Sequence, residues 1–218
     1  MTKLYFIRHG KTEWNQQGRY QGAHGDSPLL ATSLKEIDAL ATYLAPIPFA
    51  HAYVSPLPRA QATAQRLVAA LPEPVALTTD ERLREFDLGQ MEGMKFSEVE
   101  ARWPAQQENF HRHPDRYDAA LVGGESFLQV IARFKAAVHD YVTQFPQQNI
   151  LVVSHGAALN AGVNGLLGLP LVHLKDKGGL SNTSTTILAT ADGEHYQLVQ
   201  WNETGYLHKD HVDPTDTI

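Results

Sequence analysis

The residues best suited to chemistry follow directly on the first predicted strand. Residues 3–7 form a short apolar, β-branched and aromatic run, and Arg8, His9 and Gly10 come after it without a spacer. Ligands of open α/β sheets bind at the carboxyl ends of the strands. The arginine suits phosphate or carboxylate oxygens, and the imidazole could be a nucleophile, a base or a metal ligand. The glycine would let backbone approach a ligand closely. This pattern predicts an anion-binding site that begins at Arg8.

A second strand also ends in residues that could bind an anion. Residues 50–54 read as a short strand, and Ser55 with Pro56 reads as a helix N-cap followed by proline in the first turn. Apolar residues then recur at helical spacing. Arg59 is therefore expected in the first turns of a helix that starts where a strand ends.

A third strand delivers another histidine. Residues 149–153 are continuously apolar and rich in β-branched residues, which is typical of a central parallel strand buried on both faces. The strand ends in Ser154, His155 and Gly156, and a helix is predicted over residues 157–167. Two histidines and two arginines are thus expected at the same edge of one sheet.

The bulk composition limits the classes of function. The chain has 218 residues, of which 43% are hydrophobic and 19% charged, so one domain with a sizeable core is expected. The formal net charge of −6 argues against a basic surface for nucleic acid. The absence of cysteine excludes disulfides, thiolate zinc sites and thiol catalysis. With no signal-like segment and no apolar run of membrane length, we expect a cytoplasmic protein that binds neither nucleic acid nor membrane.

The segment Arg8-His9-Gly10-x-Thr12-x-x-Asn15 resembles the opening signature of the histidine phosphatase superfamily, the phosphoglycerate-mutase-like proteins. Four further segments match the pattern of this family in the same order along residues 3–202. They are Ser-Pro-Leu-x-Arg-Ala from residue 55, Leu-x-Glu from 83 with Gly-x-x-Glu-Gly from 89, Gly-Gly-Glu-Ser from 123, and Val-Ser-His-Gly from 153.

The resemblance implies an α/β fold, a three-layer α/β/α sandwich with a mostly parallel central sheet. A single domain is expected over residues 1–205. Residues 94–122 are expected as a variable helical insertion that covers the site and sets specificity. Residues 206–218 are polar and are expected to form a loose tail.

By the resemblance, His9 attacks phosphorus, with its tautomer fixed by the Gly10 carbonyl or a nearby acceptor, and Glu85 is the general acid and base. His155 is expected to be protonated and to stabilise the phosphate charge together with the arginines. The predicted catalytic residues are His9, Glu85, His155, Arg8 and Arg59. The predicted phosphate-binding residues are Arg8, Asn15, Gln21, Gly22, Arg59, His155, Gly156 and Asn182.

Some of these roles have competitors. Asp87 or Glu92 could replace Glu85 as the acid, and Asn182 is as well suited to tying backbone together as to binding substrate. His111 and His113 could bind a metal, but no histidine or carboxylate partners stand at the right spacing. We therefore expect no metal and no cofactor.

The favoured function is a metal-independent phosphatase that hydrolyses a small-molecule phosphate ester through a phosphohistidine. A phosphoglycerate mutase would use the same residues, but Arg84-Glu85-Phe86-Asp87 departs from the Asn-Glu-Arg-x-Tyr-Gly acid motif typical of mutases, and residues 94–122 carry few basic residues. A non-catalytic phospholigand-binding module is a further alternative. A homodimer is compatible with the sequence, although nothing in it indicates one.

Overall fold

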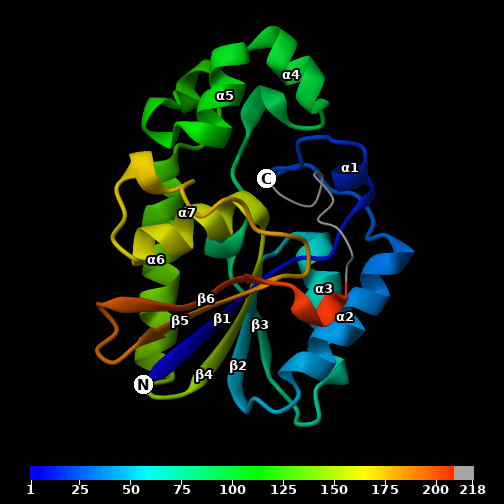
Figure 1. The fold of residues 1–218 in the computed structure, drawn as a ribbon, viewed down its shortest axis with the longest axis vertical. Helices are drawn as coiled ribbons and strands as arrows, with labels where there is room; N and C mark the ends of the chain where they lie inside the picture. The colour runs from blue at the N-terminus through cyan, green and yellow to red at the C-terminus, as the bar shows by residue number, and fades with distance from the viewer. Residues whose placement is uncertain (209–218) are drawn as a thin grey trace.

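The computed structural model describes residues 1–208 of the chain. Within this range six strands form one sheet in the order β3-β2-β4-β1-β5-β6 (Figure 1). The strands are β1 (Thr2–Arg8), β2 (Phe49–Val54), β3 (Leu77–Thr79), β4 (Asn149–Ser154), β5 (Thr185–Thr190) and β6 (Tyr196–Glu203). The first four strands pair in parallel, and β5 runs antiparallel to both of its neighbours. The predicted mostly parallel sheet is confirmed.

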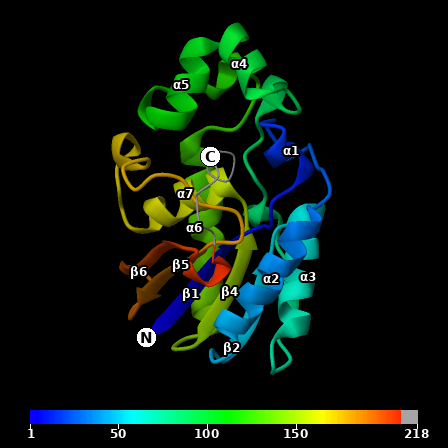
Figure 2. The same ribbon diagram turned by 45° about the vertical axis from the view of Figure 1, so that its right-hand side comes forward.

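Helices cover both faces of this sheet, as Figures 1 and 2 show. They are α1 (Glu13–Gln16), α2 (Ala31–Leu44), α3 (Pro58–Ala70), α4 (Phe96–Arg102), α5 (Pro104–Arg112), α6 (Phe127–Gln144) and α7 (Gly156–Leu166). Successive side chains of β1 point to opposite faces. Leu4 and Phe6 are buried in one core with residues of α6 and α7, whereas Tyr5 and Ile7 are buried in another with residues of α2 and α3. This arrangement is the expected three-layer α/β/α sandwich.

Residues 94–122, which the sequence predicted as a helical insertion, consist mainly of short helices. They contain α4, α5 and two 3₁₀ turns, and they lie beyond the carboxyl ends of the parallel strands (Figure 1). Their inner side is held by a third core in which Phe110 and Val99 pack with Phe127 and Ala157. The insertion is therefore anchored to the starts of α6 and α7, next to the predicted site.

One local prediction was wrong. Ser55 does not cap a helix, because α3 begins at Pro58 and its N-cap is Leu57. The structure adds the short helix α1, for which the sequence made no prediction: Thr12 and Asn15 form a capping box that starts a helical turn shortly after the first strand.

The first residues of the predicted tail pack against the domain. Residues 205–207 form a 3₁₀ turn, and the ring of Tyr206 stacks on Tyr43 with centroids 4.6 Å apart. Its hydroxyl donates to the Thr183 carbonyl at 2.6 Å. The rest of the predicted tail, from residue 209 on, lies outside the described residues. None of the helices within residues 1–208 is long and apolar enough to cross a membrane.

Candidate active site

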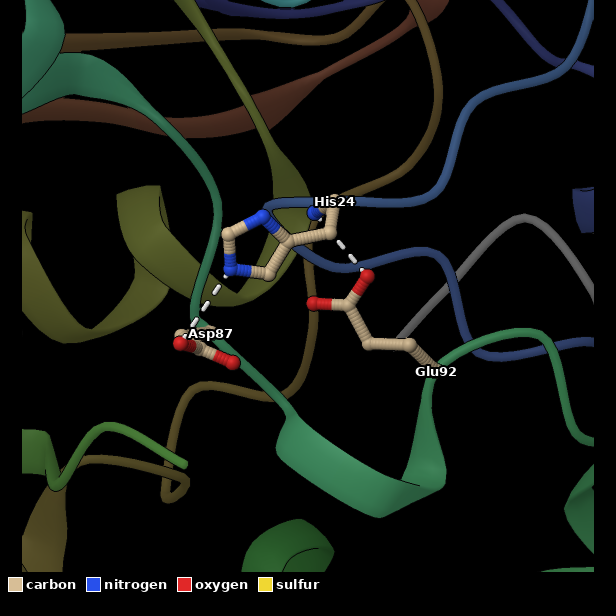
Figure 3. A group of neighbouring side chains, drawn as sticks. All are labelled: His24, Asp87 and Glu92. Atoms are coloured by element: carbon tan, nitrogen blue, oxygen red, sulfur yellow. Dashed lines mark hydrogen bonds and ion pairs between the residues drawn. The ribbon is translucent and has the colours of Figure 1, made fainter. Parts of the chain in front are cut away.

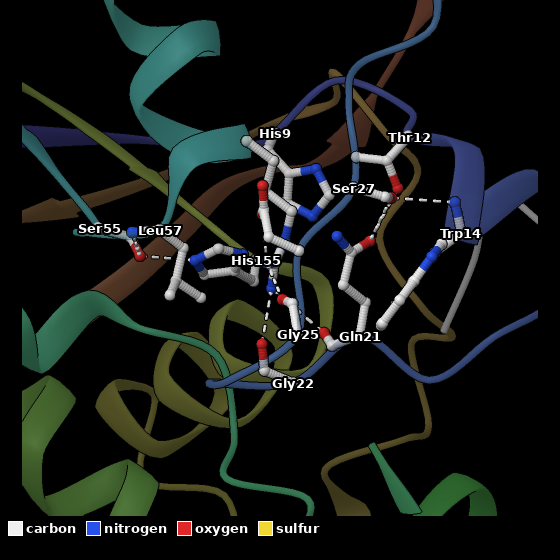
Figure 4. A network of polar contacts seen from close by, with 12 residues as sticks. His9, Thr12, Trp14, Gln21, Gly22, Gly25, Ser27, Ser55, Leu57 and His155 are labelled. Atoms are coloured by element: carbon white, nitrogen blue, oxygen red, sulfur yellow. Dashed lines mark hydrogen bonds and ion pairs between the residues drawn. The ribbon is translucent and has the colours of Figure 1, made fainter. Parts of the chain in front are cut away.

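The two histidines expected at the sheet edge do meet there. Strands β1 and β4 are adjacent and parallel, and their register pairs Arg8 with Ser154. The residues that follow, His9 and His155, therefore leave the sheet side by side. Their rings are 5.1 Å apart between centroids and inclined by 59° (Figure 4). The sequence predicted this proximity from two strand ends.

His9 is oriented as a nucleophile would have to be. Its Nδ1 lies 2.8 Å from the Gly10 carbonyl oxygen, which accepts a hydrogen bond only from a protonated Nδ1. The proton therefore stays on Nδ1 and the lone pair on Nε2. Burial, followed by the nearby charges of Arg59 and Arg8, lowers the pKa of His9 well below its ordinary value. The lowered pKa favours the neutral imidazole.

The protonated His155 predicted for the phosphate-bound site stays a prediction, and the surroundings of the free protein oppose a proton. Burial, with Arg59 as the next contributor, lowers the pKa of His155 well below its usual range, which favours the neutral imidazole. Its Nε2 is hydrogen-bonded to the Ser55 hydroxyl at 2.6 Å (Figure 4). Its Nδ1 is buried and has no hydrogen-bond partner among residues 1–208. The sequence pattern could not show how strongly two buried arginines oppose a third positive charge.

Arg59 lies at the start of α3, and its guanidinium holds the loop that follows α1. One terminal nitrogen donates to the Gly25 carbonyl at 2.8 Å and to Asp26, and the other donates to the carbonyls of Gln21 and Gly22 at 3.2 and 3.0 Å. The Nε of Arg59 is buried and lacks a partner within the described part of the chain. Arg59 therefore closes the loop around the site and keeps one N–H donor for an anion.

Arg8 is almost completely buried and donates to the Leu180 carbonyl. Gly156 lies against this guanidinium, since a Cβ at residue 156 would be 3.0 Å from Nε and 3.1 Å from Cζ of Arg8. Glycine at the first position of α7 thus leaves room for the Arg8 guanidinium beside the start of this helix. The structure brings together both arginines, as predicted.

The three predicted amide side chains have different roles. Gln21 accepts from the Thr12 hydroxyl at 2.8 Å through its oxygen, and its buried Nε2 has no partner within residues 1–208, so it can donate to an anion. Asn15 uses its oxygen to accept from the backbone and hydroxyl of Thr12. Asn182 donates to the His9 carbonyl at 3.0 Å. Of the two roles left open for Asn182, the contacts favour the structural one.

Glu85 is held at the start of α7. Its carboxylate accepts from the backbone amides of Phe86 at 2.9 Å, Ala157 at 3.1 Å and Ala158 at 2.7 Å. Arg133 of α6 fixes the segment from behind by donating to the carbonyls of residues 82, 84 and 85 and to Glu125. The side chain is therefore buried and fixed at the start of the helix that follows His155.

The two competing carboxylates are engaged at the mouth of the site. Glu92 accepts from the amides of His24 at 2.9 Å and Leu88 at 3.2 Å, and Asp87 lies 3.3 Å from Nε2 of His24 (Figure 3). Ligand atoms of these three side chains lie within 4.8 Å of one another. The hydrogen bonds among these residues connect the loop after α1 to the segment that follows Glu85. A structural role therefore accounts for this group of three side chains.

His111, considered as a metal ligand on sequence grounds, is instead hydrogen-bonded to the Tyr20 hydroxyl at 2.8 Å. Burial lowers the pKa of His111 to about 4. This histidine is therefore a neutral member of the core under the helical insertion.

Three residues of the site were missed at the sequence level: Ser55, Arg133 and Lys175. Ser55 stands at the end of a strand, as Ser154 does, and this position could have marked it as a site residue. The proline that follows Ser55 favoured a helix cap instead. Arg133 follows no motif, and only the packing of α6 against the Glu85 segment reveals it. Lys175 lies in the connection between α7 and β5, where its buried Nζ has no hydrogen-bond partner among residues 1–208.

Gly22 is needed at the point where the loop closes on the site. A Cβ there would lie 2.7 Å from the Phe86 carbonyl oxygen and would collide with Glu92. The Phe86 carbonyl is held by the Ala23 amide at 2.8 Å and cannot easily move. We expect Gly22→Ala to displace the loop and thereby move the Arg59 side chain that the loop holds. Because a misplaced arginine binds phosphate less well, the Kd for inorganic phosphate should rise about tenfold.

Calorimetric titration with phosphate measures this effect. Gly168→Ala is the control, because Gly168 has a φ of +75° but a Cβ at this position would have nothing within 4 Å, so this change strains the backbone without touching the site. The control should lower Tm and leave the Kd unchanged. Unaltered phosphate binding by Gly22→Ala would show that the loop does not hold Arg59 in place.

Fold and site together define an α/β protein with a phosphoryl-handling centre made of two histidines, two arginines and one carboxylate. A family model described as histidine phosphatase superfamily (branch 1) matches residues 4–204. The chain belongs to this superfamily.

Known relatives agree with this assignment. The "Probable phosphoglycerate mutase GpmB" of Salmonella paratyphi A is 32% identical over 211 residues, which cover 95% of this chain and 91% of the relative. The structure of Bacillus stearothermophilus YhfR superposes with a TM-score of 0.88 at 30% identity, covering 95% of this chain and all of the other. The phosphoserine phosphatase of Entamoeba histolytica, in complex with 3-phosphoglyceric acid, has a TM-score of 0.81 at 29% identity, with 95% and 100% coverage.

Proposed function

We propose that this protein is a metal-independent phosphatase that hydrolyses a small phosphate monoester through a phosphohistidine on His9. The strongest support is the state of His9 itself. It is buried, its Nδ1 proton is held by the Gly10 carbonyl, and burial with the charges of Arg59 and Arg8 favours the neutral ring, which leaves the lone pair on Nε2. A neutral imidazole with one blocked nitrogen is what nucleophilic attack on phosphorus requires.

The reaction proceeds in two steps. Nε2 of His9 forms a bond to phosphorus while the bond to the ester oxygen breaks, and Glu85 donates a proton to the departing alkoxide. A water molecule then attacks the phosphohistidine and gives its proton to Glu85, which releases inorganic phosphate and restores the imidazole. Arg8, Arg59 and Gln21 hold the phosphoryl oxygens throughout.

Binding of the substrate favours the protonated form of His155. Burial and the arginines favour its neutral form in the free protein. A phosphate ester brings almost two negative charges, and these favour a proton on His155. The hydroxyl of Ser55, at 2.6 Å from Nε2, orients the ring so that the other nitrogen can serve the phosphate.

Hydrolysis is favoured over mutase activity by the helical insertion. The mutase alternative depends on basic residues in this segment that hold the substrate while the phosphoryl group returns to it. The side chains of Lys95, Arg102, Arg112 and Arg116 are all exposed. Arg102 lies over the ring of Trp103, and the last two are paired with neighbouring acidic residues. Three of these four cations are therefore engaged with neighbours inside the insertion, and no contact in the described part of the chain joins them to the site residues above.

Phosphate release from a panel of monoesters in the presence of EDTA tests this proposal, with isomerisation of 3-phosphoglycerate followed in parallel. We expect release of free phosphate at a rate that EDTA does not change, because the cationic side chains supply the charge that a metal would. Formation of 2-phosphoglycerate without free phosphate would instead establish a mutase. Phosphate binding without either activity would establish a phospholigand-binding module.

A further inference from the structure

Lys175 carries a buried ammonium group that the proposed mechanism does not use. It lies in the connection between α7 and β5, and its Nζ is 5.7 and 5.8 Å from the ring centroids of Phe110 and Phe127. Within residues 1–208 this nitrogen has no hydrogen-bond partner. An ammonium group carries three donors, and two aromatic rings satisfy none of them as a hydrogen bond would. A buried group of this kind calls for an anionic partner.

The neighbour of Lys175, Leu174, is buried in one core with Phe110, Phe127, Ala157 and Ala158. The backbone amides of Ala157 and Ala158 hold Glu85. Burial lowers the pKa of the Lys175 amine to about 8, and the Glu85 carboxylate acts in the opposite direction. The positive charge of Lys175 also lowers the pKa of His111, in the helical insertion. Lys175 therefore lies between the predicted proton donor and the insertion that covers the site.

Glu85 cannot neutralise Lys175 by itself. Its two oxygens already accept three backbone amides from residues 86, 157 and 158, and no hydrogen bond joins Glu85 to Lys175 within the described residues. Because Glu85 must face the leaving oxygen of the ester, the group attached to that oxygen extends toward the same space as Nζ of Lys175.

We propose that Lys175 binds a carboxylate on the alcohol part of the substrate, a few bonds from the phosphoryl group. This assignment rests on the proposed function, since it uses the orientation that Glu85 imposes on the ester. One ammonium matches the single negative charge of a carboxylate better than the two charges of a second phosphate. The rings of Phe110 and Phe127, with centroids 5.5 Å apart, line the same region with apolar surface. The substrate class is then a phosphorylated small hydroxy acid.

The test compares two esters that differ only in the proposed group. 3-Phosphoglycerate carries a carboxylate where glycerol 3-phosphate carries a hydroxymethyl group. We expect the wild-type protein to prefer 3-phosphoglycerate, and Lys175→Met to reduce this preference in kcat/KM at least about tenfold, as loss of a buried ionic partner does in substrate selection. Lys177→Met is the matched control, because Lys177 is exposed on the same connection and contacts Trp201 and Asn164 instead.

Binding without turnover separates this proposal from the proposed function. The Kd of each ester is measured calorimetrically in His9→Ala, with and without Lys175→Met, so a preference for the carboxylate is visible even if the protein releases no phosphate. Lys175→Gln provides a second variant of similar length should Lys175→Met fail to fold. An equal loss for both esters would make Lys175 a support of Glu85, and the absence of any preference in His9→Ala would likewise overturn the assignment.

Discussion

Replacing His9 by alanine should lower kcat by about 10⁴-fold or more, because removal of a nucleophile leaves only the catalysis supplied by binding and charge. Phosphate affinity should change much less. Arg8, Arg59 and Gln21 remain in place, and none of the contacts described for them includes the His9 ring. The two effects therefore separate in one variant, which a merely misfolded protein would not show.

Steady-state phosphate release and calorimetry measure the two quantities, and ³¹P NMR of quenched reactions should detect phosphohistidine in the wild type alone. His139→Ala is the control, because His139 is exposed on α6 and far from the sheet edge that carries the site. Turnover by His9→Ala within tenfold of the wild type would show that another group attacks phosphorus.

The layered fold could be predicted because its signals are local. The run that became β4 is apolar along its whole length, and a strand buried on both faces needs that pattern. The sequence of β1 ends in the residues that the sheet presents to a ligand. Errors arose where a side chain had two suitable partners. Ser55 is a good helix cap in isolation, but in the folded chain it pairs with a histidine 100 residues away.

The site could be predicted only as far as single strand ends define it. His9, His155 and the two arginines follow from motifs at the ends of elements. The protonation state of His155 does not, because it depends on how many cations the fold buries around that ring. The support of Glu85 by Arg133 and the burial of Lys175 depend on the packing of α6, the insertion and the α7–β5 connection, which share no local pattern.

Glu85→Gln should have the second largest effect, and the effect should depend on the leaving group. With 3-phosphoglycerate the departing alkoxide is a strong base that needs a proton, and we expect kcat/KM to fall about 10²–10⁴-fold. p-Nitrophenyl phosphate releases a stable phenolate, so its kcat should fall far less. Glutamine can keep an oxygen where Oε1 accepts the Phe86 and Ala158 amides, and only the Ala157 amide loses its acceptor.

Glu92→Gln is the matched comparison, because it removes the charge of the competing carboxylate and retains an acceptor for the amides of His24 and Leu88. It should raise KM modestly, because the loop that Glu92 holds is loosened. The ratio of kcat/KM for 3-phosphoglycerate to that for p-nitrophenyl phosphate should stay unchanged. If Glu92→Gln instead produced the dependence on leaving group, the proton would come from the mouth of the site and not from the start of α7. Only a donor that touches the leaving oxygen makes the rate depend on the basicity of that oxygen, so this ratio identifies the acid independently of any general loss of activity.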